Sequence, residues 1–331
     1  MILERQMRWN SSSIVQSINM EIFDLHADIG MHILAQKNKN ETDILKRYHI
    51  EKLTKGGIFG VGMACFFEGH ETKEIAIQMV ESLRDEINQN LDTLNWYKGG
   101  SLDQTRINAM MTVEGMCFID DNPEEMIEWL YEQGVRIGSL SWNDENALST
   151  GVRGNPLRGL TDLGRRAITR MNELGMIVDI SHTNEKSFWD ILSFSKKPVI
   201  ATHSNTRFLS NVDRNLTDQQ ILALIQNKGL IGLVAAKKFV SQDESKQNSK
   251  ELARHASHIK KLGGLDNLAV GFDYMDFLEG DFGRFSMASD LQDASDSQNL
   301  ITALLDEGFS ESEIEKIAYR NVQRFLNDHL K

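Results

Sequence analysis

The sequence has few cysteines and no excess of basic residues. Cys65 and Cys117 form no Cys-x-x-Cys pair, so they predict neither a zinc ribbon nor a disulfide framework, and a reducing compartment is the default expectation. The formal net charge is −12 and the pI is near 5.3. Nucleic acid is therefore excluded as the expected partner, because a phosphate-binding face needs clustered Lys and Arg.

Long apolar segments are also lacking. No window approaches the roughly 20 apolar residues that a membrane-spanning helix requires, and residues 1–20 contain no apolar stretch that fits a signal-peptide core. We therefore expect a cytoplasmic protein without membrane attachment. Residues 1–19 are interpreted as an N-terminal extension, with either Met1 or Met20 as the start, and residues 20–331 as a single domain.

What the chain does contain is a regular alternation of short apolar runs and longer amphipathic segments, which is typical of βα units around a parallel sheet. Eight strands are expected, at 21–26, 59–66, 107–113, 135–140, 176–181, 199–202, 230–235 and 268–273. Helices are expected at 42–55, 71–92, 124–133, 161–174, 184–195, 217–227, 249–262 and 311–328. The count predicts an α/β fold of the (β/α)8 TIM-barrel type with some distortion. A doubly wound open sheet is the competing fold, but it usually has fewer strands.

Polar residues of metal-binding type follow the expected strands. His26 and Asp28 stand at the end of the first expected strand. Later strands end in the same way, the third at Glu114, the fifth at His182, the sixth at His203 and the eighth at Asp273. In a barrel the carboxyl ends of the strands converge on one mouth, where the active site is expected. The i, i+2 spacing places the first pair on one face of its strand, so that both can bind one cation. The two oxygens of Glu114 can bridge two cations, and the two later histidines complete the second site. This ligand mixture suits Zn²⁺ and, less well, Mn²⁺ or Fe²⁺.

Each of these residues also has an ordinary structural explanation. A single histidine after an apolar run is more often a core residue than a ligand, and an Asp at a strand end is usually a helix cap. These explanations would have to hold six times at once, which favours a site. The other six histidines, His32, His49, His70, His255, His258 and His329, are expected in loops, on polar helix faces or at the C-terminus. His255 and His258 in particular are expected on a solvated face.

These segments carry a resemblance to a known family. DLHADIG at 24–30 resembles the His-x-Asp segment of the membrane (renal) dipeptidase family, a branch of the metal-dependent amidohydrolase superfamily. TVEG, DISH and ATHS resemble its later ligand segments, and VDRNLTDQQI resembles its Arg-Asn segment. The resemblance covers about residues 20–328. It implies a binuclear zinc dipeptidase with two Zn²⁺ per chain, a small dipeptide as substrate, and often a homodimer.

The resemblance also implies a role for each matching residue. His26, Asp28 and the bridging Glu114 would bind one zinc, and Glu114, His182 and His203 the other. Arg214 would bind the C-terminal carboxylate of the substrate, which suits a planar guanidinium. Asp273 would accept a proton from the attacking water and pass it to the leaving amine. The YMDF segment that follows departs from the family pattern, so Asp276 is the alternative proton carrier.

Two further departures concern the substrate. Trp142 stands near the position where the best-known members have a histidine that stabilises the oxyanion; its indole N–H can donate one hydrogen bond but cannot titrate. LVAAKKF lacks an expected tyrosine, and Lys237 and Lys238 are the candidates to replace it.

The leading hypothesis is a zinc dipeptidase that hydrolyses small dipeptides, including those with a C-terminal D-residue, by means of a metal-bridging hydroxide. The alternatives are a metal-dependent amidohydrolase acting on another amide, and a metal-containing binding protein without turnover.

Overall fold

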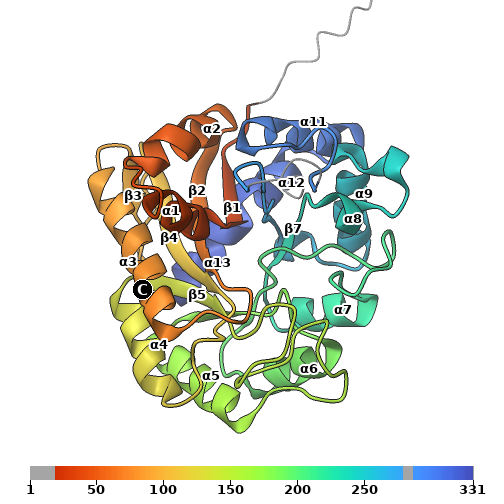
Figure 1. The fold of residues 1–331 in the computed structure, drawn as a ribbon. Helices are drawn as coiled ribbons and strands as arrows, with labels where there is room; N and C mark the ends of the chain where they lie inside the picture. Colours follow the sequence, from red (N-terminus) through yellow and green to blue (C-terminus); the bar gives the residue numbers. More distant parts are fainter. Residues whose placement is uncertain (1–18, 279–285, 331) are drawn as a thin grey trace, which may run out of the picture.

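The computed structural model describes residues 19–278 and 286–330; residues 1–18, most of the expected N-terminal extension, lie outside this range. Parallel strands occupy the centre and helices surround them (Figure 1). The strands are β1 Ile22–Ala27, β2 Ile58–Phe66, β3 Leu94–Trp96, β4 Ile107–Glu114, β5 Val135–Ser139, β6 Ile177–Asp179, β7 Ile231–Leu233 and β8 Leu268–Val270. Their order in the sheet is β6-β5-β4-β2-β1-β8-β7, and every pairing is parallel.

The sheet closes into a distorted barrel through a segment that is not a regular strand. The expected strand at 199–202 forms only two parallel bridges, Asp179↔Ile200 to the end of β6 and Ala201↔Ile231 to the start of β7. The Asp179 carboxylate accepts the backbone N–H of Thr202 at 3.0 Å, so a side chain replaces the strand ladder there. The predicted barrel is thus confirmed with this local correction, and β3 is an additional strand that pairs with β4.

The helices are α1 Ile29–Lys37, α2 Ile50–Lys55, α3 Lys73–Gln89, α4 Pro123–Glu132, α5 Asp162–Leu174, α6 Glu185–Phe194, α7 Asp218–Gln226, α8 Lys237–Val240, α9 Ser249–Lys261, α11 Gln298–Asp306, α12 Glu311–Glu315 and α13 Asn321–His329. The expected helices at 42–55 and 311–328 each contain a π-helical turn, at Leu45–His49 and Lys316–Arg320. The sequence did not predict α1, because its polar residues His32 and Gln36 are as buried as its apolar ones and leave no polar face.

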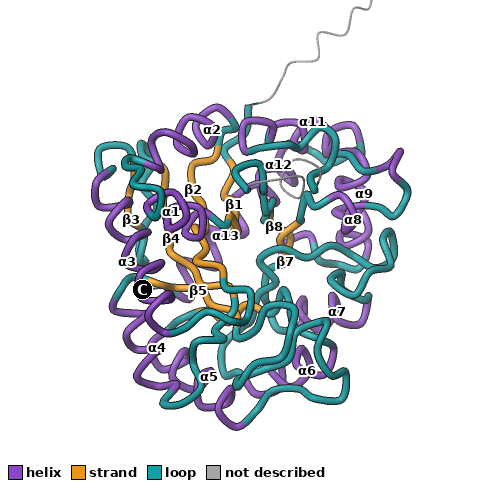
Figure 2. Tube along the Cα trace, in the orientation of Figure 1, coloured by secondary structure: helices purple, strands orange, loops and turns teal. Residues whose placement is uncertain are grey.

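Local sequence explains where several helices begin. Thr161 and Asn184 accept the backbone N–H groups of Gly164 and Ser187, and Thr217 forms a reciprocal capping box with Gln220. The strands of the barrel are buried on both faces, as parallel strands covered by helices must be; every residue of β1 and β4 is buried. The long segment between β5 and α5 is loop and lies near the strands (Figure 2).

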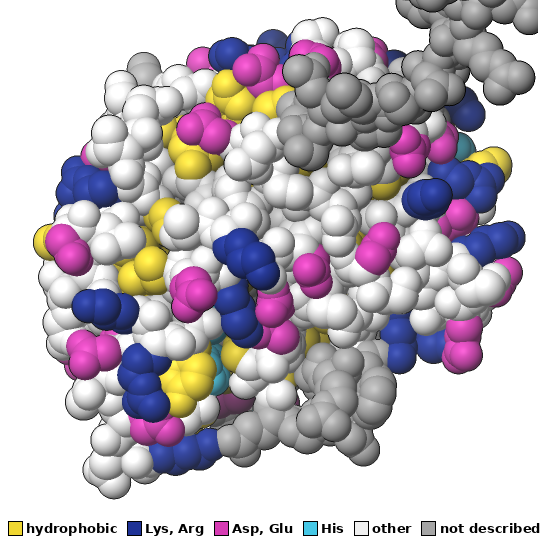
Figure 3. All heavy atoms as spheres, turned by 90° about the horizontal axis from the view of Figure 1, so that it is seen from above, with side chains coloured by type: hydrophobic (Ala, Val, Ile, Leu, Met, Phe, Trp, Pro, Cys, Tyr) yellow, Lys and Arg dark blue, Asp and Glu magenta, His cyan; other side chains and the backbone are white. Residues whose placement is uncertain are grey.

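The surface carries mixed charge. Lys and Arg side chains are interspersed with Asp and Glu over the face seen in Figure 3. Among the described residues, no helix combines the length and the apolar character needed to cross a bilayer.

Candidate metal centre

β1 delivers the first pair of predicted ligands to the centre of the barrel. His26 is 2% exposed, and its Nε2 lies 3.3 Å from Oδ1 of Asp28. Asp28 occupies the N-cap position of α1 but makes no side-chain capping bond. The ordinary explanation of Asp28 as a helix cap therefore fails, because its carboxylate faces His26.

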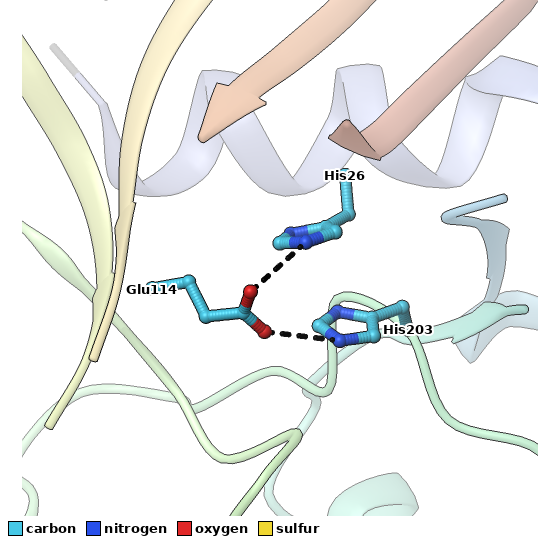
Figure 4. Close-up of side chains that lie close together, drawn as sticks. All are labelled: His26, Glu114 and His203. Carbon is cyan, nitrogen blue, oxygen red and sulfur yellow. Dashed lines mark ion pairs between the residues drawn. The ribbon is translucent and has the colours of Figure 1, made fainter. Parts of the chain in front are cut away.

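Glu114, the last residue of β4, lies between histidines from different parts of the barrel (Figure 4). Its Oε2 is 3.5 Å from Nε2 of His26, whereas its Oε1 is 2.7 Å from Nε2 of His182 and 3.2 Å from Nε2 of His203. The two carboxylate oxygens thus face two different sets of nitrogens. This is the arrangement expected of a carboxylate that bridges two cations.

Hydrogen bonds fix the tautomers of the other two histidines. Nδ1 of His182 lies 2.9 Å from Oδ1 of Asn143, and Nδ1 of His203 lies 2.8 Å from the hydroxyl of Thr202. That hydroxyl donates its own proton to Asp179 at 2.6 Å, so it accepts from His203. Both rings therefore carry their proton on Nδ1 and present a bare Nε2. These two Nε2 atoms are 2.9 Å apart.

The residues present fit a metal ion. Two Nε2 atoms and one carboxylate oxygen converge with their lone pairs, an arrangement that a bound cation would stabilise. Four buried side-chain atoms that have no hydrogen-bond partner among the described residues gather at the same place: Nε2 of His26, Oδ1 of Asp28, Oε1 of Glu114 and Oδ1 of Asp273. Two groups of possible ligands share His26: one with Glu114 and His203, the other with Asp28 and Asp273. The chain thus provides possible metal-ligand atoms on both sides of His26.

Burial and neighbouring charges shift the pKa values of the candidate ligands. Burial and then the Arg214 charge lower the pKa of His182 to about 4, and burial and then His26 lower the pKa of His203. Burial and the Glu114 carboxylate raise the pKa of Asp28. Burial would raise the pKa of Glu114 as well, but His182 and His26 hold it well below its usual value. The lowered pKa values keep His182 and His203 neutral, as metal binding requires, whereas the pKa of His26, which burial alone would lower, is raised by the Glu114 and Asp28 carboxylates. A divalent cation would therefore displace protons from His26 and Asp28 on binding.

The structure separates the two candidate proton carriers. Asp273 is 6% exposed, and its Oδ1 lies 3.8 Å from Nε2 of His26, whereas Asp276 forms an ion pair with Lys52 outside this cluster. Burial and the nearby Asp28 carboxylate raise the pKa of Asp273 well above its usual value. Asp273 has a left-handed backbone, with φ 58°, and its N–H donates to the carbonyl of His26 at 3.2 Å. The preference for Asp273 over Asp276 agrees with this placement.

Arg214 and Trp142 both lie beside His182. Arg214 is buried; its Nη1 donates to the carbonyl of Ser181, and its Nη2 donates to the carbonyl of His203 at 3.2 Å and lies 3.1 Å from Nε2 of His182. Within residues 19–278 and 286–330, its Nε has no hydrogen-bond partner. The Trp142 ring centroid is 5.9 Å from that of His182, and the indole is half-buried. Both residues that were assigned to substrate binding thus border the candidate metal ligands.

Sequence reasoning missed the residues that orient the ligands. Asp179 accepts hydrogen bonds from the backbone and the hydroxyl of Ser181 and from Thr202, and Asp24 accepts the backbone N–H groups of His26 and Phe272. Asn143 holds His182. The available signal was an acidic residue inside an apolar strand two or three positions before a histidine, as in Asp24-Leu25-His26 and in DISH. Asp179 orients the ring of His203 through the Thr202 hydroxyl, whereas Asp24 holds the backbone at His26.

Glycine permits the close approach that places His203. A Cβ at Gly232 or Gly271 would lie 1.8 or 1.9 Å from the carbonyl oxygen of Thr202, which is an impossible contact. The segment before His203 can lie directly against the middle of β7 and the residue after β8 because both positions lack a side chain.

The expectation for three other histidines was wrong. His255 is fully buried in α9, where its Nε2 donates to the carbonyl of Val240 at 2.8 Å and its Nδ1 accepts the N–H of Thr206 at 3.2 Å. His32 and His49 are buried as well, with 2.9 Å between Nδ1 of the first and Nε2 of the second. The polar neighbours of these histidines in the sequence gave no sign of burial, because their partners are distant in the chain.

His255 should make stability depend on pH. Burial lowers its pKa from 6.5 to about 4. The unfolded chain therefore binds the proton first, and the stabilisation is complete above pH 6.5 and is lost as the pH falls towards 4. Between pH 7.5 and pH 5 we expect a loss of roughly 2 kcal/mol from this residue in the free energy of unfolding.

Denaturant unfolding at both pH values would measure this loss. H255Q should be less stable than the parent at neutral pH but should lose about 2 kcal/mol less on acidification. H70Q, which alters an exposed loop histidine, is the matched control and should follow the parent. Parallel pH profiles for H255Q and the parent would contradict the assignment.

The chain is similar to known proteins over most of its length. The family model described as membrane dipeptidase (peptidase family M19) matches residues 13–330. An uncharacterised protein of Klebsiella pneumoniae, from the 5' region of pqqA, is 30% identical over 235 residues, which are 68% of this chain and 83% of that protein. A protein of Claviceps purpurea named dipeptidase tcpJ is 31% identical over 222 residues, which are 66% of this chain but only 50% of that protein.

Solved structures share the fold. A metallopeptidase of Rhodobacter sphaeroides, liganded with a phosphinate mimic of the dipeptide L-Ala-D-Ala, superposes with a TM-score of 0.82 at 21% identity, covering 95% of this chain and 100% of that chain. A dipeptidase of family M19 gives the same TM-score and identity, with coverage of 95% and 99%. A probable 2-pyrone-4,6-dicarboxylic acid hydrolase of Acinetobacter baumannii is more distant, with a TM-score of 0.55 at 12% identity, covering 93% of this chain and 99% of that chain.

Proposed function

Because this chain belongs to the membrane dipeptidase family (peptidase family M19), a family of metallopeptidases, we propose that it is a zinc-dependent dipeptidase with two zinc ions per chain. The observation that carries the proposal is the position of Glu114. Its two oxygens face different histidines, with His26 and Asp28 on one side and His182 and His203 on the other. His26, Asp28 and Glu114 would hold one zinc, and Glu114, His182 and His203 the other.

When bound, the two ions would supply a hydroxide at neutral pH and polarise the scissile carbonyl. Asp273 accepts the proton of the attacking water and passes it to the leaving amine; its unpartnered buried Oδ1 beside His26 supports this role. Arg214 binds the C-terminal carboxylate through a buried guanidinium, which supplies directed donors. Trp142 donates its indole N–H to the substrate at the side of His182.

The substrates proposed are small dipeptides, including those with a D-residue at the C-terminal side. The Rhodobacter structure, which has the same fold, was liganded with a mimic of L-Ala-D-Ala, and this supports the D-residue part of the proposal. We further propose that the chain works in the cytoplasm as a homodimer. Support for the compartment comes from its two free cysteines, of which Cys65 is buried.

The test is a dipeptide panel with a metal control. Protein stripped with a chelator should release no amino acids from L-Ala-L-Ala or L-Ala-D-Ala, and addition of Zn²⁺ should restore turnover, with two zinc per chain by elemental analysis. The bridging arrangement predicts that a single equivalent of zinc restores little activity. The proposal fails if zinc-replete protein hydrolyses no dipeptide, and hydrolysis of N-acyl amides alone would assign a different amidohydrolase activity.

A further inference from the structure

A cationic side chain, that of Arg153, lies next to Trp142, the aromatic residue that borders the candidate metal ligands. In the loop after β5, the N–H of Arg153 donates to the carbonyl of Asn143 at 2.7 Å, and Asn143 in turn holds His182. This contact brings the guanidinium of Arg153 to 5.7 Å from the Trp142 ring centroid. Because the Trp142 ring packs beside His182, Arg153 is linked to the site both by its backbone and by its side chain.

Arg153 has an exposed guanidinium, and the structure gives it no carboxylate partner within the described part of the chain. Several other surface arginines are paired with a carboxylate, as Arg166 is with Glu124 at 2.7 Å. The nearby Glu145 accepts the backbone N–H of Asn155 instead. In a protein of net charge −12, an unpaired guanidinium beside the site is available to an anionic ligand.

The distances suit a side chain of the substrate. The distances from the Trp142 ring to Arg153 and to His182 place the guanidinium at most about 12 Å from the His182 ring. Two extended residues span roughly 7 Å, and their side chains add to this reach. Resting on the proposed function, we propose that Arg153 determines specificity by binding the side-chain carboxylate of acidic dipeptides. Arg214, which is buried against the loops of His182 and His203, is left to the terminal carboxylate.

The competing explanation is that Arg153 only packs on Trp142 and stabilises its loop. A guanidinium within about 6 Å of an indole is attracted to it whether or not a ligand is present. Loss of packing alone would lower the turnover of acidic and neutral substrates together. Loss of a carboxylate partner would instead change their ratio, which separates the two explanations.

The experiment compares isosteric substrates. The ratio of kcat/KM for Ala-Asp to that for Ala-Asn is measured for the zinc-loaded parent and for R153M, which keeps an unbranched side chain but removes the charge; Asp-Ala and Asn-Ala test the other position. We expect the acidic-to-neutral ratio to fall about tenfold in R153M, as for the loss of a charge-assisted hydrogen bond, and R153K to recover part of it. R165M is the matched control, because Arg165 is a half-buried arginine of α5 whose guanidinium likewise lies over an aromatic ring, 5.1 Å from the centroid of Phe194 on α6.

A second measurement needs no variant. In the parent, the acidic-to-neutral ratio should fall as salt is raised from about 0.05 M to about 0.5 M, because an exposed ion pair is screened. An unchanged ratio in a folded, zinc-loaded R153M, or a ratio insensitive to salt, overturns the role of Arg153 while dipeptide turnover itself stands. Absence of turnover on all four dipeptides overturns the proposed function instead.

Discussion

Replacement of Glu114 by glutamine is expected to reduce bound zinc from two ions per chain to at most one and to lower kcat/KM by roughly 10³-fold or more, as expected when several kcal/mol of metal-assisted stabilisation are lost. The reason is the proposed role of this one carboxylate as a ligand of both ions. Its oxygens lie 3.5 Å from Nε2 of His26 and 2.7 Å from Nε2 of His182. The amide keeps the shape but presents one oxygen and no charge.

Elemental analysis after dialysis, together with steady-state kinetics, measures both effects. A third readout is the rise in melting temperature on addition of Zn²⁺, since a ligand that binds only the folded state stabilises it by mass action. This rise should be clearly smaller for E114Q than for the parent. Chelated E114Q and parent protein should have the same circular dichroism spectrum, which shows that the variant folds.

The chain offers a matched control in E86Q. Glu86 is 1% exposed in α3, where it accepts the N–H of Leu45 at 3.1 Å. Its replacement should lower stability, because a charge-assisted hydrogen bond is weakened, but should leave both zinc ions and turnover in place. Two zinc ions and parental activity in E114Q would contradict the bridging role.

The barrel could be predicted because its signal is repeated. Each βα unit shows an apolar run followed by an amphipathic segment, and a single misjudged unit does not change the count. The segment at 199–202 shows the limit, since it is apolar like its neighbours but loses its ladder to the carboxylate of Asp179. The helix α1 shows another limit, because its polar residues His32 and Gln36 are buried and leave no periodic polar face to detect.

The sequence predicts that the candidate ligands lie close together, but it does not reveal the residues that support them. His26, Glu114 and His203 follow apolar runs, and the barrel topology brings strand ends together whatever lies between them. By contrast, the contact of His182 with Asn143 and that of His255 with Thr206 depend on loop conformation and on side-chain direction. No periodicity in the sequence encodes these. Buried histidines such as His32 and His49 therefore look the same in the sequence as exposed ones.

Replacement of Asp273 by asparagine is expected to lower kcat by about 10³-fold to 10⁴-fold, the upper range for loss of a general acid–base group. Asparagine is suited to this test, because it tolerates the left-handed backbone at φ 58° as well as aspartate does. The fold and the N–H bond to the carbonyl of His26 should therefore persist. Kinetics of the zinc-loaded variant measure the loss, and KM should change far less than kcat.

Metal content then decides how Asp273 acts. Its Oδ1 lies 3.8 Å from Nε2 of His26, and with His26 and Asp28 it forms a group that could hold an ion, so a role as a ligand is the alternative to proton transfer. Two zinc ions in an inactive D273N would support proton transfer, whereas one zinc would make Asp273 a ligand. D276N is the matched control: Asp276 pairs with Lys52 away from the cluster, so parental turnover is expected. A D273N variant as active as the parent would remove Asp273 from the reaction, because neither role survives without its charge.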